Sequence, residues 1–240
     1  MAIISENLQI GIMTPFYIAL TLVFAVFHHF WTCKLRHRLA EYIVGYIPRL
    51  SIEWGYHVQN WFVRVLLPLA IVLSRGGDPE VLGFKLPYLT VEVFSMVLLL
   101  TVALFLITTI IVWFAISISK DPTVIETVKN WPKKPSLKKS LAGILLWTFP
   151  EECFLRGYLI SQFMEFNSTI AILISTFFTS ILHKSRGKFW ITLSIFTGLI
   201  FGLTYIWTYS LLPPLIVHSI CNEIFPLILT SWTKKLSQET

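Results

Sequence analysis

Long apolar stretches without formal charge dominate the chain. Segments 7–33 and 93–119 contain no Asp, Glu, Lys or Arg. A helix needs about 20 mainly apolar residues to cross the hydrocarbon core of a bilayer, so both stretches predict membrane-spanning helices. Segment 54–74 is a weaker candidate because Arg64 interrupts it, and it either spans the membrane or lies in the interface.

The second half of the chain adds four predicted spans. These are segments 140–164, 166–182, 189–208 and 213–231. The last two divide one charge-free stretch that is too long for a single helix, and Pro213 and Pro214 favour a break between them. The pattern therefore predicts an all-α membrane bundle of about seven transmembrane helices.

Composition supports a membrane protein. The chain is 55% apolar and 13% charged, with a mean hydropathy of +0.71, whereas soluble domains carry roughly 25% charged residues. So few charges would not cover a globule in water. Three isolated cysteines make no disulfide framework, and no internal repeat divides the chain.

The basic residues cluster in four places along the sequence. They are Lys34, Arg36 and Arg38, six lysines from Lys120 to Lys139, Lys184, Arg186 and Lys188, and Lys234 and Lys235. Alternation with the predicted spans puts all four clusters on one side of the membrane. By the positive-inside rule, the N-terminus lies outside and the C-terminus in the cytoplasm.

This placement also accounts for the net charge of +6. The basic clusters indicate topology and contact with membrane lipids, so nucleic-acid binding loses its support. The first span lacks a preceding basic region and a small-residue cleavage site, and we expect it to be retained.

One predicted span carries three ionisable residues within six positions. Glu152 and Arg156 are four residues apart, which predicts an ion pair on one helical face. Glu151 lies about 100° further round the helix. It needs a partner on another helix or must take up a proton, so it is the reactive candidate. Pro150 removes a backbone donor and frees the carbonyl of Leu146.

Three more polar residues are candidates for the same site. His183 ends one predicted span, and His218 and Asn222 lie four apart on another. That spacing puts His218 and Asn222 on one face, where they could bind a developing oxyanion or contribute to a metal site. With Glu151, these groups offer a general base and oxyanion donors together.

The order of these motifs resembles that of a known family. Glu151-Glu152-x-x-x-Arg156, a His about thirty residues later and a final His218-x-x-x-Asn222 are similar to the CAAX protease and bacteriocin-processing (CPBP) family. This family of intramembrane proteases includes the type II CAAX prenyl endopeptidases. The resemblance covers roughly residues 140–230 and implies three parts: membrane helices and a basic cytoplasmic loop (1–139), a catalytic helix core (140–232) and a short basic cytoplasmic tail (233–240).

The resemblance implies an intramembrane endopeptidase that acts near the cytoplasmic face. Glu151 and His183 would activate a water, while His218 and Asn222 would stabilise the oxyanion. Glu152 and Arg156 would orient the site. A zinc ion held by Glu151, His183 and His218 remains an alternative, although no HExxH is present and the metal-free arrangement is favoured.

Two functions from other classes stay open. One is a non-catalytic binding or immunity protein that keeps the polar cluster, and the other is a transporter with a proton relay. The resemblance also implies a peptide or prenylated protein as substrate. For the family it would be the end of a prenylated CaaX protein, or a peptide processed for maturation or immunity. Arg64 is a further candidate, for a substrate carboxylate or a lipid headgroup.

Overall fold

Helices make up all the regular structure in the described part of this computed structural model. The described residues are 23, 52–74, 76–85, 90–118, 137–164 and 166–223. Apart from position 23, the predicted span 7–33 lies outside them, as do the basic cluster after it, most of the 120–139 loop and the C-terminal tail. The last predicted span, 213–231, is described only to residue 223.

Three described helices are long and apolar enough to cross a membrane. They are Trp54–Ser74, Val91–Ile118 and Lys188–Thr208, and they correspond to the predicted spans 54–74, 93–119 and 189–208. The apolar helix Ser168–Leu182 is shorter, with 15 residues. The membrane character is thus confirmed, whereas the count of seven spans stays a prediction.

The described elements are α-helices interrupted by π-helical and 3-10 segments. The label η is used for both of these segment types. Their bounds are α3 (Ile52–Trp61), η2 (Phe62–Leu66), α4 (Leu67–Ser74), η3 (Pro79–Leu82), α5 (Val91–Trp113), η4 (Phe114–Ile118), α7 (Leu137–Gly143), η5 (Ile144–Thr148), α8 (Phe149–Glu152), η6 (Cys153–Ile160), α9 (Ser161–Met164), α10 (Ser168–Leu182), η7 (Lys184–Arg186) and α11 (Lys188–Thr208). A helix over 212–223 follows.

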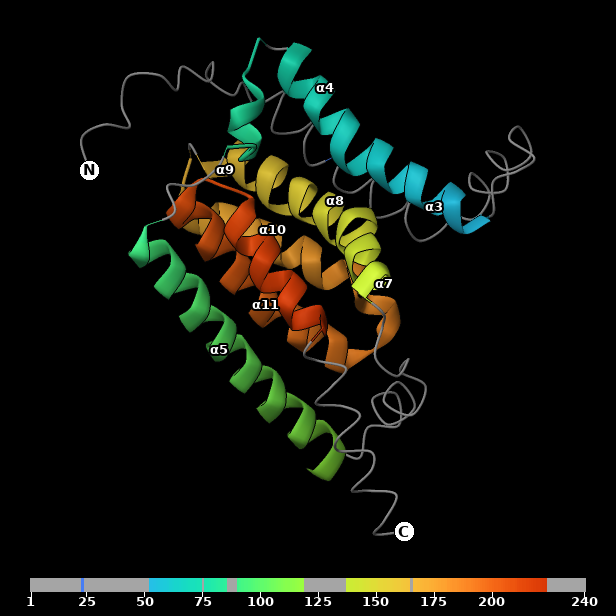
Figure 1. Ribbon diagram of the computed structural model, residues 1–240, viewed down its shortest axis with the longest axis vertical. Helices are drawn as coiled ribbons and strands as arrows, with labels where there is room; N and C mark the ends of the chain where they lie inside the picture. The colour runs from blue at the N-terminus through green and yellow to red at the C-terminus, as the bar shows by residue number, and fades with distance from the viewer. Residues whose placement is uncertain are drawn as a thin grey trace.

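The run from α7 to α9 forms one continuous helix, called here the 137–164 helix. Figure 1 shows it between α3 and α4 on one side and α10 and α11 on the other, with α5 along the outer side of α11. All eight residues of its η6 segment are buried. The charged helix is therefore the centre of the bundle, and the more apolar helices surround it.

Small residues allow α10 and α11 to pack closely. A Cβ atom added at Gly198 would lie 3.1 Å from the Cα of Thr176, and one at Gly202 would lie 3.1 Å from Ile172. Gly198 and Gly202 are four residues apart and share one face, the small-xxx-small arrangement that brings membrane helices together. This close approach fixes α10, whose C-cap is His183.

A turn at residues 79–85 packs against the 137–164 helix and against the loop that follows α11. Leu82 is 1% exposed, and its carbonyl oxygen would lie 2.6 Å from a Cβ atom at Gly157. Gly83 has φ +80°, and its carbonyl accepts a hydrogen bond from the Leu211 amide at 3.0 Å. Ser210 donates to the Lys85 carbonyl at 2.6 Å. We call this segment the 79–85 turn.

Candidate active site

Pro150 shapes the helix just before the two glutamates. The carbonyl of Leu146, which the proline leaves without its helical partner, accepts a hydrogen bond from the Asn60 side chain at 2.8 Å. Trp61 donates to the neighbouring carbonyl of Leu145 at 3.1 Å. Asn60 of α3 thus supplies a donor to the carbonyl that Pro150 is predicted to free.

Glu152 lies at the centre of a buried charge cluster. Its Oε2 atom is 3.4 Å from Nε of Arg156, and its Oε1 atom is 2.6 Å from Nδ1 of His218. Glu152 and Arg156 are both fully buried. The predicted i,i+4 pair is confirmed, and His218 from the 212–223 helix extends it to a third group.

Phe201 on α11 contacts both Arg156 and His218. Its ring stacks on the His218 ring with centroids 4.8 Å apart, and the Arg156 guanidinium lies 5.2 Å from its centre. The ring face is attractive to a cation. His218 is therefore held in place by the Glu152 carboxylate at Nδ1 and by the Phe201 ring, which stacks on the imidazole.

Glu151 has its charged neighbour on another helix. Its Oε2 atom lies 3.8 Å from a terminal nitrogen of Arg64, at the centre of the π turn η2. The requirement for a partner outside its own helix is thus confirmed. Arg64, the candidate for binding a substrate carboxylate or a lipid headgroup, therefore lies beside the reactive candidate.

The hydrogen bond of His183 defines its tautomer. Nδ1 lies 2.9 Å from the carbonyl oxygen of Thr179. A carbonyl only accepts, so Nδ1 carries the proton and Nε2 is left as the nitrogen able to accept one. His183 is the C-cap of α10, which places this base at the end of a helix that the glycines of α11 hold in position.

Asn222 connects the 212–223 helix to the 137–164 helix. Its side-chain amide donates to the Thr148 hydroxyl at 3.3 Å, one turn before Glu152. Four residues earlier, His218 contacts Glu152 itself. The predicted shared face of His218 and Asn222 is confirmed, because both side chains reach the same neighbouring helix.

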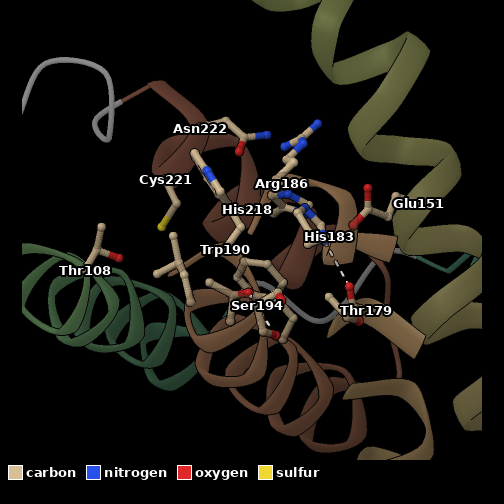
Figure 2. Close-up of a pocket in the computed structure, with 13 residues that line it drawn as sticks. Thr108, Glu151, Thr179, His183, Arg186, Trp190, Ser194, His218, Cys221 and Asn222 are labelled. Carbon is tan, nitrogen blue, oxygen red and sulfur yellow. Dashed lines mark hydrogen bonds between the residues drawn. The ribbon is translucent and has the colours of Figure 1, made fainter. Parts of the chain in front are cut away.

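One cavity gathers the candidate residues (Figure 2). Glu151, His183, His218 and Asn222 line it, together with Arg186 and Trp190. Its volume of about 120 Å³ is enough for several waters, since one water needs roughly 10–15 Å³ on this measure. Glu152 and Arg156 do not line the cavity. Glu152 contacts His218, which does line it, and Arg156 contacts Glu152.

The alternative to a metal-free site is a zinc ion held by Glu151, His183 and His218. Among the residues that the structure describes, no three His, Cys, Asp or Glu side chains gather as a metal site. Glu151 lies 3.8 Å from Arg64. Nδ1 of each histidine is engaged by a carbonyl or a carboxylate, as in metal-ligating histidines, and Nε2 is the nitrogen that could hold a metal. All three side chains line the one cavity.

Several residues of the site were not found from the sequence. Asn60, Thr148, Phe201 and Trp190 are separated in sequence from the charged motifs that they contact or help to enclose. An uncharged residue in an apolar segment looks like core. A polar Asn60 within segment 54–74 was the one available signal.

Residues 134–224 match the family model described as type II CAAX prenyl endopeptidase Rce1-like. The matched segment contains both glutamates, both histidines and Asn222. No curated protein and no solved structure matches the chain. The match confirms the resemblance expected from the sequence: residues 134–224 of this chain are similar to the type II CAAX prenyl endopeptidases of the Rce1-like family.

Proposed function

We propose that the chain hydrolyses a peptide bond within the membrane by means of a water activated by Glu151 and His183. The observation that carries the proposal is the shared cavity, which the Glu151 carboxylate and the His183 imidazole line together and which has room for water. A carboxylate and an imidazole are suitable general bases near neutral pH. The proposed catalytic core is residues 140–232.

The proposed reaction begins with the attack of water on the substrate carbonyl. Glu151 and His183 take up its proton as the new C–O bond forms. His218 and Asn222 then donate N–H groups to the oxyanion. When the tetrahedral intermediate collapses, the C–N bond breaks and the departing amine receives the proton, leaving a carboxylate and an amine as products.

The buried pair behind His218 supports its oxyanion role. Glu152 accepts from Nδ1 at 2.6 Å, so Nε2 is the nitrogen left to face the substrate. An imidazolium that donates at Nε2 is stabilised by the Glu152 carboxylate. Arg156 pairs with that carboxylate and holds it in place, which makes Glu152 and Arg156 positioning residues in this proposal.

We further propose that the substrate is a peptide or prenylated protein, cut near its C-terminus as in CaaX processing. The cut would lie near the cytoplasmic face, because His183 is next to the basic residues 184–188. Cysteine accessibility labelling that found positions 184–188 outside the cytoplasm would reject this orientation, and with it an N-terminus outside.

The decisive experiment is cleavage of a quenched fluorescent farnesylated CaaX peptide by detergent-purified protein. Glu151→Gln and His183→Ala should each lower kcat by about 10²- to 10⁴-fold, and Asn222→Ala by about 10²- to 10³-fold. Glu80→Gln is the matched control, because Glu80 is an exposed carboxylate outside the cavity.

Each alternative predicts a different result in the same assay. Full activity in Glu151→Gln would reject the proposed base. Activity that a zinc chelator abolishes and added zinc restores would reject water activation by protein groups alone. Binding of the peptide by wild type without cleavage would favour the non-catalytic function.

A further inference from the structure

Arg186 is the only Lys or Arg among the described residues that line the cavity. It lies three residues after His183, in the short helix η7 between α10 and α11. Figure 2 draws it between Asn222 and Glu151, beside His183. A cation at this place adds positive charge to a site that otherwise holds one carboxylate.

The other two arginines near the site have carboxylate partners. Arg64 lies 3.8 Å from Glu151, and Arg156 lies 3.4 Å from Glu152. Within the described ranges, no carboxylate comes within ion-pair distance of Arg186. The charges of both glutamates are thus matched by other cations, and the charge of Arg186 is available to a ligand.

Trp190 provides the contact that holds this arginine. The Arg186 guanidinium lies 5.7 Å from the Trp190 ring centre, and the Trp190 side chain is itself buried at 8% exposure. A guanidinium that rests on an aromatic ring still has N–H groups at its edge, in the fork geometry that binds a carboxylate with two hydrogen bonds.

We propose that Arg186, supported by Trp190, binds the terminal carboxylate of the peptide substrate. The inference rests on the proposed endopeptidase function and assigns a specificity-determining residue to it. An extended peptide spans about 3.3–3.6 Å per residue, so a carboxylate bound at the wall of this cavity is only a few residues from the peptide bond that faces Glu151 and His183.

The test compares two substrates that differ in one group. One is the farnesylated peptide with a free C-terminal carboxylate, and the other is the same peptide with a C-terminal amide. Wild type should cleave the amide with a KM roughly 10- to 100-fold higher, as for the loss of a charged hydrogen-bonded contact, and with a similar kcat.

The variants assign that difference to one side chain. Arg186→Gln should raise KM for the carboxylate peptide by the same factor and leave the kinetics of the amide unchanged. Arg186→Lys should recover part of the loss, because it keeps the charge without the fork. Lys184→Gln is the control: it removes one charge from the same loop, but Lys184 lines a separate apolar groove.

The outcomes separate the two proposals. Equal kcat/KM for both peptides with wild type would overturn the carboxylate site and leave the endopeptidase function intact. Equal losses on both peptides in Arg186→Gln would also overturn it, since a merely structural role affects them alike. Failure of wild type to cleave either peptide would reject the proposed function and the inference with it.

Discussion

Nδ1 of His218 lies 2.6 Å from Oε1 of Glu152 and connects the 212–223 helix to the centre of the bundle. The same carboxylate is 3.4 Å from Arg156, at a place where neither Glu152 nor Arg156 is exposed. Removing one member of a buried charge cluster leaves the others without compensation. The cluster therefore affects both stability and the orientation of His218.

Glu152→Gln is expected to destabilise the protein by roughly 3–5 kcal/mol and to lower activity strongly, because Arg156 loses its counter-charge. Thermal unfolding in detergent measures the first effect and peptide cleavage the second. In the double variant Glu152→Gln/Arg156→Met no unpaired charge remains, so its loss of stability should be smaller than the sum of the two single losses. Additive losses would contradict the coupling.

Arg64→Gln is expected to lower kcat/KM by roughly tenfold or more. The substitution removes the attraction between Arg64 and Glu151, and each 1.4 kcal/mol of lost interaction lowers kcat/KM by about a factor of ten. The lost cation lies 3.8 Å from Glu151 and compensates its charge. Arg64→Lys keeps the positive charge, so it should keep most of the activity. An equal loss in Arg64→Lys would show that Arg64 has a different role.

Gly157→Ala is expected to destabilise the protein by roughly 1–3 kcal/mol, because the new Cβ would meet the Leu82 carbonyl at 2.6 Å. Gly143→Ala is the matched control on the same helix, where a Cβ meets nothing within 4 Å. It should be neutral or stabilise by up to about 1 kcal/mol. Equal melting temperatures for the two variants would reject the close approach of the 79–85 turn.

Asn60→Ala should cost roughly 1–3 kcal/mol, since it leaves the Leu146 carbonyl without the donor that replaces the one Pro150 lacks. Alanine at position 150 restores a backbone N–H. In the Pro150→Ala background the same Asn60→Ala substitution should therefore cost less, and a double-mutant cycle of melting temperatures measures the difference. An equal cost in both backgrounds would show that the two residues are independent.

Local spacing predicted the parts of the site that depend on one helix. The Glu152–Arg156 pair, the common face of His218 and Asn222, and the carbonyl freed by Pro150 all follow from helical geometry. The need of Glu151 for a partner on another helix followed from the cost of an isolated charge in a membrane.

The rest depends on contacts between helices that spacing does not encode. Nothing in the sequence identifies Arg64 as the neighbour of Glu151 or Phe201 as the ring beneath His218. The π turns on either side of Pro150 and at Arg64 also change the direction of side chains in a way that a regular 3.6-residue period does not predict.

The 79–85 turn has a consequence for how the chain assembles. Tyr205 donates to the Val81 carbonyl across 124 positions, and Ser210 donates to the Lys85 carbonyl across 125. Each of these partners is synthesised more than 120 residues after the turn, so the turn lacks both hydrogen bonds until synthesis has passed Ser210. A fragment limited to residues 134–224 lacks the backbone acceptors of Tyr205 and Ser210, so we expect it to be less stable than the full chain.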